Sequence, residues 1–288
     1  MVAFLTAVVI LACMYAILAA GFVIIYKSSR ILNFAHAEIG LIIAYALVTF
    51  LNVLPGPPIV SIAMALILSF MLGLVIHALF IRPLAGQPVF ATILLTVALG
   101  IVLQSIAVLI WHGNTETVTF GWRHYYTIMP AVRVSSVEII IVSAAIVFFS
   151  ALLSFYKYSR VGWQMRATAE NVLLAAQRGI NIDFVMALSW GIGTFAIGVG
   201  AVLLAGYSSV SLSMTQMAIK AFAVSLVGGL DSVKGIIPAA AIVAAAELAA
   251  NQYVNPRLAD AIPFLIMLIV LVIRPWGLFG TEEEHERV

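Results

Sequence analysis

Long apolar runs separated by short polar segments dominate the chain. A helix needs about 20 apolar residues to cross the hydrocarbon core of a bilayer. The runs that approach this length are 3–25, 37–54, 59–80, 90–111, 137–157, 184–206, 212–230, 235–251 and 261–276. They predict an all-α polytopic membrane protein with about 8–9 transmembrane helices, and no low-complexity linker divides residues 1–288 into more than one membrane domain. The runs 212–230 and 235–251 are short and interrupted by glycine, so a re-entrant hairpin is the alternative for this pair.

One polar segment, Lys157 to Asp183, interrupts the apolar pattern near the middle of the chain. Within it, apolar residues recur at helical spacing, at positions Ala169, Val172, Leu173, Ala176 and Ile180. This spacing predicts an amphipathic helix from about Trp163 to Arg178. Gly179 would end that helix in the left-handed conformation. From these residues alone, the apolar side of the helix either lies on the membrane surface or docks a partner.

Composition supports the membrane assignment. Hydrophobic residues make up 64% of the chain and charged residues only 9%, whereas soluble domains carry about 25% charged residues. The net charge of +2 provides no basic field for nucleic acid. The single cysteine, Cys13, cannot form an internal disulfide or a cysteine-rich metal site, so we expect it to be a packing residue.

The cations indicate how the spans are oriented. No cation precedes the first apolar run, so we interpret it as a retained span that enters with its N-terminus outside. This orientation places ten cations in the cytoplasm: Lys27, Arg30, Arg82, Lys157, Arg160, Arg166, Arg178, Lys234, Arg274 and Arg287. It leaves Arg123, Arg133 and Arg257 outside, with Lys220 inside a span. Cytoplasmic loops are enriched in Lys and Arg, which favours this orientation. With the N-terminus outside and nine spans, the C-terminus is then predicted in the cytoplasm.

The one long outer connection, residues 112–136, is bordered or occupied by four Trp and Tyr residues. They are Trp111, Trp122, Tyr125 and Tyr126. Aromatic residues at this depth commonly anchor a protein in the interface. A connection of this length is also a candidate docking surface for an extracytoplasmic partner.

Asn33, His36 and Glu38 stand where the second span begins. Asn33 can cap the helix, and Glu38 in the first turn favours the helix dipole. His36 and Glu38 are two positions apart and do not share a helix face, so a zinc site is not expected. The alternative to a capped span start is a structural elbow beside a permeation path, since polar groups at membrane depth usually face protein or water.

A second group of polar residues and glycines follows in the 212–251 region. Gly228 and Gly229 interrupt short apolar segments, and such discontinuous helices line the substrate path in transporters. Lys220 and Glu247 fall within spans, where each needs water or a partner. They either pair with each other, or Lys220 reaches the surface while Glu247 sits near a helix end.

The chain contains no recognisable catalytic set. No GxxxxGK[ST] phosphate-binding loop, GxSxG or CxxC motif occurs in the sequence. The residues alone therefore do not favour an enzyme, and a transport subunit is what the family resemblance carried by five stretches of the chain implies. Two rivals remain: a secondary transporter using Glu38 or Glu247 for an ion, and an intramembrane enzyme built around His36.

Five stretches give the chain a family resemblance: AILAAGFVIIYKSSRILNFAHAEIG (16–40), RPLAGQPVFATILLTVALGIVLQ (82–104), MRATAENVLLAAQRGIN (165–181), AIKAFAVSLVGGLDSVKGIIPAAAI (218–242) and RPWGLFG (274–280). They resemble the LivH-type permeases of branched-chain amino acid ABC transporters, in family order over nearly the whole chain. Ala37 departs from the glycine common after NFAH, and 238–240 is less glycine-rich than usual.

The resemblance implies partners and a mechanism. It implies a second, LivM-like permease, two cytoplasmic ATPase subunits that bind ATP and Mg, and a periplasmic substrate-binding protein, with no cofactor on this chain. The membrane is then the bacterial inner membrane and the mechanism is alternating access. Branched-chain amino acids are the expected substrates, and urea, amides or aromatic acids are alternatives within the family.

The resemblance also assigns a coupling segment, about 159–182, that inserts into an ATPase subunit. The expected coupling residues are Arg166, Glu170, Asn171, Ala175, Ala176 and Gly179. For the translocation path we predict Asn33, His36, Gln104, Lys220, Ser225, Gly228, Gly229 and Glu247. Polar groups and broken-helix backbone would there relieve the cost of moving a zwitterion through the bilayer.

Overall fold

The structure, a computed structural model, describes residues 1–54, 56–118, 120, 124–129 and 132–282. The described residues form twelve α-helices: α1 (Val2–Ser29), α2 (His36–Val53), α3 (Pro58–Ile76), α4 (Val89–Trp111), α5 (Ser136–Tyr158), α6 (Arg160–Glu170), α7 (Val172–Gln177), α8 (Ile182–Tyr207), α9 (Met214–Gly228), α10 (Ile236–Tyr253), α11 (Pro256–Ala259) and α12 (Ile262–Ile273). A π-helical turn, η1 (His77–Ile81), and a 3-10 turn, η2 (Arg82–Leu84), extend α3. Two short antiparallel pairs complete these elements: β1 (Glu116–Thr117) with β4 (Ser209–Val210), and β2 (Tyr125–Met129) with β3 (Val132–Ser135).

Within the described part of the chain, seven helices are long and apolar enough to cross a membrane, and α9 and α12 are shorter apolar helices. The prediction of an all-α polytopic membrane protein is confirmed. The sequence predicts the last span over 261–276, but α12 ends at Ile273. Arg274 precedes a proline and adopts φ −138° and ψ 95°, which are not helical values. Twelve residues rise about 18 Å, less than the roughly 30 Å of hydrocarbon in a bilayer.

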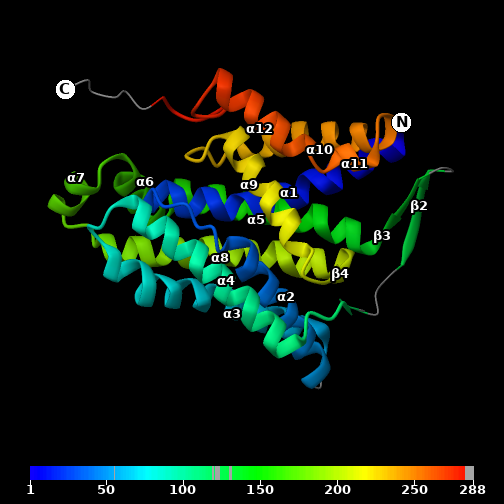
Figure 1. Ribbon diagram of the computed structural model, residues 1–288, viewed down its shortest axis with the longest axis horizontal. Coiled ribbons are helices and arrows are strands. Elements are labelled where there is room, and N and C mark those ends of the chain that lie inside the picture. Colours follow the sequence, from blue (N-terminus) through cyan, green and yellow to red (C-terminus); the bar gives the residue numbers. More distant parts are fainter. Residues whose placement is uncertain (55, 119, 121–123, 130–131, 283–288) are drawn as a thin grey trace.

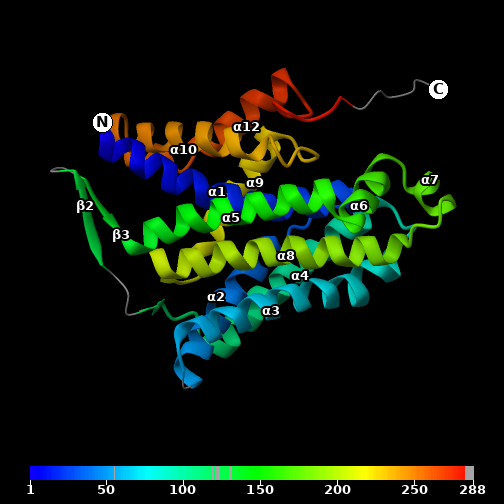
Figure 2. The ribbon, with the colours of Figure 1, turned by 180° about the vertical axis from the view of Figure 1, so that it is seen from behind.

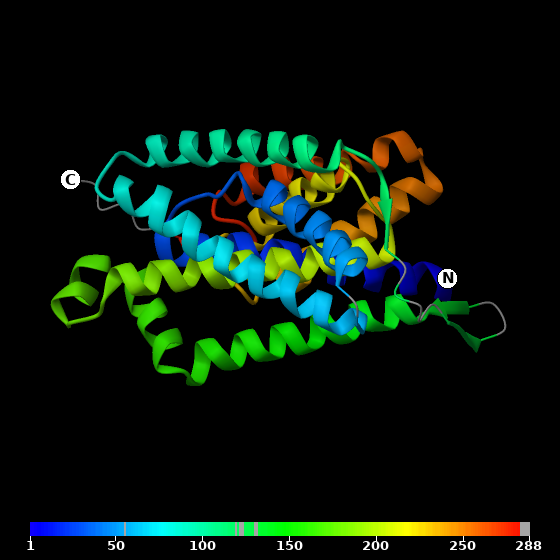
Figure 3. The same cartoon turned by 90° about the horizontal axis from the view of Figure 1, so that it is seen from below.

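Helices α1, α2 and α8 form the centre of the bundle. In their most apolar stretches 72%, 61% and 67% of the residues are buried, against 28% in the spans containing α3, α4 and α5. Figure 3 shows α4 and α5 on opposite flanks of the bundle. The flanking helices expose Val, Leu and Ile side chains, which suit contact with lipid or with another membrane subunit.

The central helices approach closely where α1 carries Gly21. A Cβ at this position would stand 2.4 Å from the His36 ring of α2 and 2.6 Å from the Gly193 carbonyl oxygen of α8. A residue without a side chain is therefore needed for these three helices to meet. The hydroxyl of Ser69 on α3 donates to the Thr194 carbonyl of α8 at 2.5 Å, which joins the next helix to the centre.

The two ends of the bundle carry different elements. Helices α6 and α7 and the segment after α12 lie at one end (Figure 1). The N-terminus, the β2–β3 hairpin and α11 lie at the other, as the reverse view also shows (Figure 2). We call these the α7 end and the hairpin end. The polar segment and the long connection thus lie at opposite ends of the bundle, and their location on opposite sides of the membrane stays a prediction.

The aromatic residues at the hairpin end do not behave alike. Trp111 packs inward, with its ring stacked on Tyr45 at a centroid distance of 5.2 Å. Tyr125 and Tyr126 are 68% and 53% exposed on the hairpin. Trp122 lies outside the described residues. The structure thus gives Trp111 a packing role, while anchoring and docking both remain open for the two tyrosines.

The end of the described chain packs against the turn that follows α9. The backbone N–H of Leu278 donates to the Val227 carbonyl at 2.9 Å. Gly229 and Gly277 have φ values of 98° and 83°, and a Cβ on Gly277 would stand 2.7 Å from the Gly229 nitrogen. Glycine is needed at both positions for this contact. We call residues 276–281 the C-terminal clamp.

Candidate functional site

The polar segment singled out in the sequence folds at the α7 end, but as two helices. The prediction of one helix from about Trp163 to Arg178 is wrong, because Asn171 separates α6 from α7 with φ −156° and ψ 106°. The Asn171 Oδ1 accepts a hydrogen bond from the Leu174 N–H at 2.9 Å. An asparagine side chain competes with helical backbone bonding in this way. The same residue therefore ends one helix and caps the next.

Gly179 ends α7 as predicted, with φ 81°. Its N–H donates to the Ala176 carbonyl at 2.9 Å, and the Ile180 N–H donates to the Ala175 carbonyl at 3.1 Å. These two bonds form a Schellman motif, and burial of Ala175 and Ile180 adds the apolar contact typical of it. Ser159 caps the start of α6 through its side chain. The short α6–α7 unit is thus fixed at both ends and at its break.

The outward surface of α7 is apolar. Val172, Leu173 and Leu174 are 43%, 69% and 57% exposed, and α7 protrudes from the bundle (Figures 1 and 2). Of the five positions in the predicted apolar stripe, only Ile180 is buried. The stripe therefore points away from the bundle, and adjacent exposed apolar side chains on a protruding helix form an interaction surface.

The residues expected to act in coupling divide into an exposed and an inward group. Exposed around α7 are Glu170, Asn171, Ala176 and Gly179. Ala175 is buried in the core, and Arg166 is half-buried on the wall of a cavity. Only the first group is available to a partner at the surface.

Lys220 of α9 lies between two carboxylates. Its Nζ is 2.7 Å from Glu247 Oε1 of α10 and 2.6 Å from Asp260 Oδ1, just after α11. The Tyr15 hydroxyl of α1 donates to Glu247 Oε2 at 2.5 Å. Of the two alternatives for Lys220 and Glu247, the structure shows the pair, whereas Asp260 and Tyr15 were not predicted. The side chains of Lys220 and Glu247 are 14% and 10% exposed and that of Asp260 is 76% exposed, so the network leads from the bundle interior to its surface.

The connection between α1 and α2 is fixed by two polar side chains. Asn33 Oδ1 accepts from the Ala35 N–H at 3.1 Å. The hydroxyl oxygen of Thr96 on α4 accepts from the Phe34 N–H at 3.2 Å. Because α2 begins at His36 without a side-chain cap, Asn33 stabilises the preceding turn and does not cap the helix as predicted. The contact of Thr96 was not predicted from the sequence, because this residue lies inside an apolar run.

His36 and Glu38 face different surroundings, as their spacing predicts. His36 is fully buried, and its ring centroid is 4.1 Å from that of Phe22. Glu38 lines a cavity of about 480 Å³ together with Gln104. Glu38 Oε2 has no hydrogen-bonding partner among the described residues. Among all residues that the structure describes, no group of three His, Cys, Asp or Glu side chains is arranged to hold a metal ion.

This cavity, which we call the Glu38 cavity, lies between α1, α2, α4, α9 and α12. Its aromatic wall is formed by Phe22, Phe34 and Phe222, with centroids 5.2 Å apart for Phe22–Phe222 and 5.7 Å for Phe34–Phe222. Mostly apolar walls with a few polar groups are the usual form of a small-molecule site. Gln104 was predicted for the path, whereas Glu38 was assigned only to the helix dipole or to a rival ion site.

Three further residues predicted for the path lie outside the Glu38 cavity. Ser225 is fully buried, and its hydroxyl donates to the Phe222 carbonyl at 2.7 Å. A Cβ on Gly228 would stand 2.9 Å from the Gly235 carbonyl oxygen. Gly229 contacts the C-terminal clamp. These positions are packed against backbone, and their part in translocation stays a prediction.

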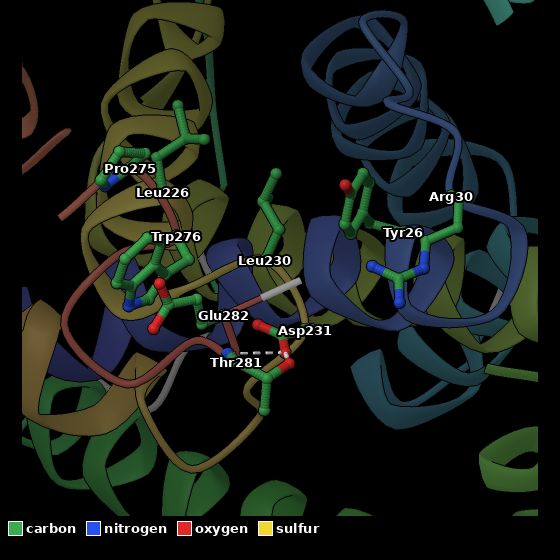
Figure 4. Close-up of a pocket in the computed structure, with 9 residues that line it drawn as sticks. All are labelled: Tyr26, Arg30, Leu226, Leu230, Asp231, Pro275, Trp276, Thr281 and Glu282. Carbon is green, nitrogen blue, oxygen red and sulfur yellow. Dashed lines mark hydrogen bonds between the residues drawn. The ribbon is translucent and has the colours of Figure 1, made fainter. Parts of the chain in front are cut away.

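A cavity of about 450 Å³ with both polar and apolar walls opens at the α7 end, beside the clamp (Figure 4). Tyr26 and Arg30, from the end of α1, stand on one side of it, and Asp231 and Thr281 stand on the other. The Thr281 N–H donates to Asp231 Oδ2 at 3.0 Å. The clamp and the α9–α10 turn thus form one wall, and the end of α1 forms the opposite wall.

Seven helices long and apolar enough to cross a bilayer, among the described residues, define a multi-pass membrane protein, and the Glu38 cavity lies between them. The sequence profile described as the permease component of branched-chain amino acid transport systems matches residues 4–271, and the chain belongs to this family. The family resemblance found in the sequence is confirmed.

Individual relatives align over almost their full length. The chain is 26% identical to the high-affinity branched-chain amino acid transport system permease protein LivH of Escherichia coli, over 93% of this chain and 92% of that protein. It is 27% identical to BraD of Pseudomonas aeruginosa over the same shares. A probable LivH permease of Methanocaldococcus jannaschii is 24% identical over 92% of this chain and 88% of that protein. No solved structure matches the chain.

Proposed function

We propose that the chain is one permease subunit of an ATP-driven importer that moves branched-chain or related hydrophobic amino acids across the inner membrane. The observation that carries this proposal is the alignment of nearly the whole chain with permeases named for branched-chain amino acid transport. Urea, amides or aromatic acids are the alternative substrates. Ion-coupled secondary transport is the less favoured mechanism.

In the proposed transporter, ATP binding and hydrolysis by partner subunits act on the α7 end. The sequence has no phosphate-binding loop, so ATP and Mg bind to two cytoplasmic ATPase subunits. The exposed Val172, Leu173 and Leu174 support docking of α7 on one of them. Closure of the ATPases then moves α6 and α7 and shifts the permease between two states. Driving such an equilibrium from 1:99 to 99:1 requires about 5.5 kcal/mol of differential binding.

Substrate enters from the hairpin end, where a periplasmic binding protein delivers it. In the Glu38 cavity, the carboxylate of Glu38 receives the substrate ammonium group and the Phe22, Phe34 and Phe222 rings contact its apolar side chain. A second, LivM-like permease covers the open side of the flanking helices. The chemistry is binding and release only, without a covalent step.

Reconstitution tests the proposal. The chain is placed in proteoliposomes with the second permease and two ATPases, and the binding protein is supplied on the opposite side. Uptake of labelled leucine, isoleucine and valine is expected only when ATP and all subunits are present. A panel of urea, amides and aromatic acids separates the substrate alternatives. Ion-driven uptake by this chain alone would establish the secondary-transporter reading instead.

The docking role of α7 has its own test. Glu170→Arg or Gly179→Pro should leave membrane insertion intact and lower uptake at least tenfold, while ATP hydrolysis by the complex continues. Glu282→Arg, another exposed charge reversal at the same end, is the control and should transport normally. Normal coupled uptake by both α7 variants would remove this role.

The substrate path is tested at Glu38. Losing a charge-assisted contact of roughly 1.5–3 kcal/mol predicts that Glu38→Gln lowers maximal uptake about tenfold or more at saturating loaded binding protein. Gln104→Ala should have a smaller effect, since it removes a neutral partner. Full uptake by Glu38→Gln, with normal assembly, would place the path elsewhere.

A further inference from the structure

A second cavity at the α7 end, of about 560 Å³, is strongly cationic. Lys27, Lys157, Arg166 and Lys234 line it, and they come from α1, α5, α6 and the α9–α10 turn. One carboxylate, Asp231, faces them. We call this the basic cavity. Glu170 also acts electrostatically on Lys27, but four cations against these two carboxylates still leave an excess positive charge.

Asp231 does not neutralise these cations by a direct ion pair. Its Oδ2 accepts hydrogen bonds from both the N–H and the hydroxyl of Thr281. The Lys27 ammonium instead lies over the Tyr156 ring, 5.7 Å from its centroid. Lys157 lies over the Tyr158 ring at 5.0 Å. Contacts with aromatic faces hold the cations in place but bring no negative charge.

The position of the basic cavity identifies its ligand class. Lys27 and Lys157 lie in the last turns of α1 and α5, where these apolar helices leave the membrane. The cavity wall also contains the apolar side chains of Leu153, Val233 and Phe279. An anionic group at the cations and an apolar group at this wall would match the two halves of the site.

We infer that the basic cavity binds an anionic phospholipid, with its phosphate among Lys27, Arg166 and Lys234 and its glycerol backbone against Leu153 and Phe279. Basic pockets between membrane helices are suited to anionic headgroups, because the phosphate lies at the same depth as the cations. A bound lipid then joins α1 and α5 to α6 and to the α9–α10 turn. It does not depend on which solute the permease carries.

Lipid retention by the assembled transporter is the test. The complex is placed in nanodiscs of phosphatidylcholine with a minor fraction of phosphatidylglycerol, purified and analysed by native mass spectrometry. The wild type should retain phosphatidylglycerol above its share of the nanodisc lipid. Lys27→Gln/Lys234→Gln should weaken retention about thirtyfold, from roughly 1 kcal/mol for each lysine.

Controls separate this site from general attraction to basic residues. Arg178→Gln removes an exposed cation at the same end and outside the basic cavity, and should retain the lipid fully. If the double variant fails to assemble, Lys234→Gln alone, an exposed turn residue, should still weaken retention several-fold.

Three results would overturn the inference. One is equal loss of lipid in Arg178→Gln and the cavity variants. Another is equal retention of phosphatidylcholine and phosphatidylglycerol. The third is binding of soluble inorganic phosphate, seen as protection of Lys27 from amine labelling, without any protection by phosphatidylglycerol; this would identify a soluble anion as the ligand.

Discussion

Lys220 carries a charge into an apolar bundle, and its neighbours explain how the charge is tolerated. Glu247 and Asp260 each lie within 2.7 Å of its Nζ, and Tyr15 holds the second oxygen of Glu247. A buried pair of this kind adds little net stability compared with apolar residues of the same size. Removing one partner is costly, because the other charge is left in the interior.

The first prediction follows from this asymmetry. Lys220→Leu should lower the free energy of unfolding by roughly 3 kcal/mol, because Glu247 keeps only its Tyr15 contact. Lys220→Leu/Glu247→Leu should recover most of the loss, and Arg133→Leu on the exposed hairpin should change little. Thermal unfolding of the purified protein in detergent measures these variants together with Glu247→Leu alone. A double variant as unstable as the sum of the single changes would contradict the pairing.

The same network shows what single residues reveal in a sequence. Two charges inside apolar runs need partners or water, so the sequence offered the Lys220–Glu247 pair as one of two alternatives. Tyr15 could not, because a tyrosine in an apolar run looks like any core residue and its partner is 232 positions away. Thr96 was missed for the same reason. Such contacts depend on how helices are placed, which local spacing does not encode.

At the scale of elements, helix boundaries follow local chemistry more closely than apolar length. The spans could be predicted because burial in lipid demands long apolar runs. Arg274-Pro275 ends α12 at Ile273, although the predicted apolar run reaches residue 276. Gly229 ends α9 at Gly228, although the predicted run reaches residue 230. The α6–α7 break was missed because Asn171 fits the helical period while its side chain favours a cap.

The second prediction concerns that break. Asn171→Ala removes the cap of α7, which costs about 1 kcal/mol, and favours fusion of α6 and α7 into one helix. Asn171→Asp, which keeps a capping oxygen, is the matched control. Hydrogen exchange should show changed protection at residues 172–177 only in the alanine variant. Identical exchange in both variants would mean that the cap does not define the break.

The Schellman end of α7 supports a third prediction. Gly179→Ala places a Cβ at φ 81°, which costs roughly 1–2 kcal/mol for a residue with a side chain. We expect faster exchange and faster proteolysis around residues 175–180. Gly56→Ala also places a Cβ at a positive φ, of 157°, but in an exposed turn remote in sequence from α7; it is the control and should have little effect on residues 175–180. Unchanged proteolysis in Gly179→Ala would show that the motif does not limit local opening.

At the scale of the whole molecule, the chain is a two-sided bundle, with α6 and α7 at one end and the β2–β3 hairpin at the other (Figure 1). The excess of cations in the segments assigned to the α7 end predicts that this end faces the cytoplasm. Arg123 and Arg287, two of the cations used in that prediction, lie outside the described residues. The orientation therefore needs a direct measurement.

The fourth prediction provides it. In a Cys13→Ala background expressed without the partner ATPases, which would cover α7, Leu173→Cys should react with a membrane-impermeant maleimide only after the cells are opened. Tyr125→Cys should react in intact cells. The wild-type side chains of Leu173 and Tyr125 are both exposed, but Leu173 lies at the α7 end of the bundle and Tyr125 at the hairpin end. Ala19→Cys, at a fully buried position, should stay unlabelled in both conditions. Labelling of Leu173→Cys in intact cells would invert the orientation.

The C-terminal clamp has a consequence for biosynthesis. The Asp231–Thr281 contact joins residues 50 positions apart, so the turn after α9 reaches its final packing only after the ribosome has delivered almost all of the described chain. Until then, the newly made turn keeps its backbone carbonyls and the Asp231 carboxylate available to water. A nascent chain stalled before residue 276 should thus be the species that quality-control proteases recognise, although all seven long spans have already been made.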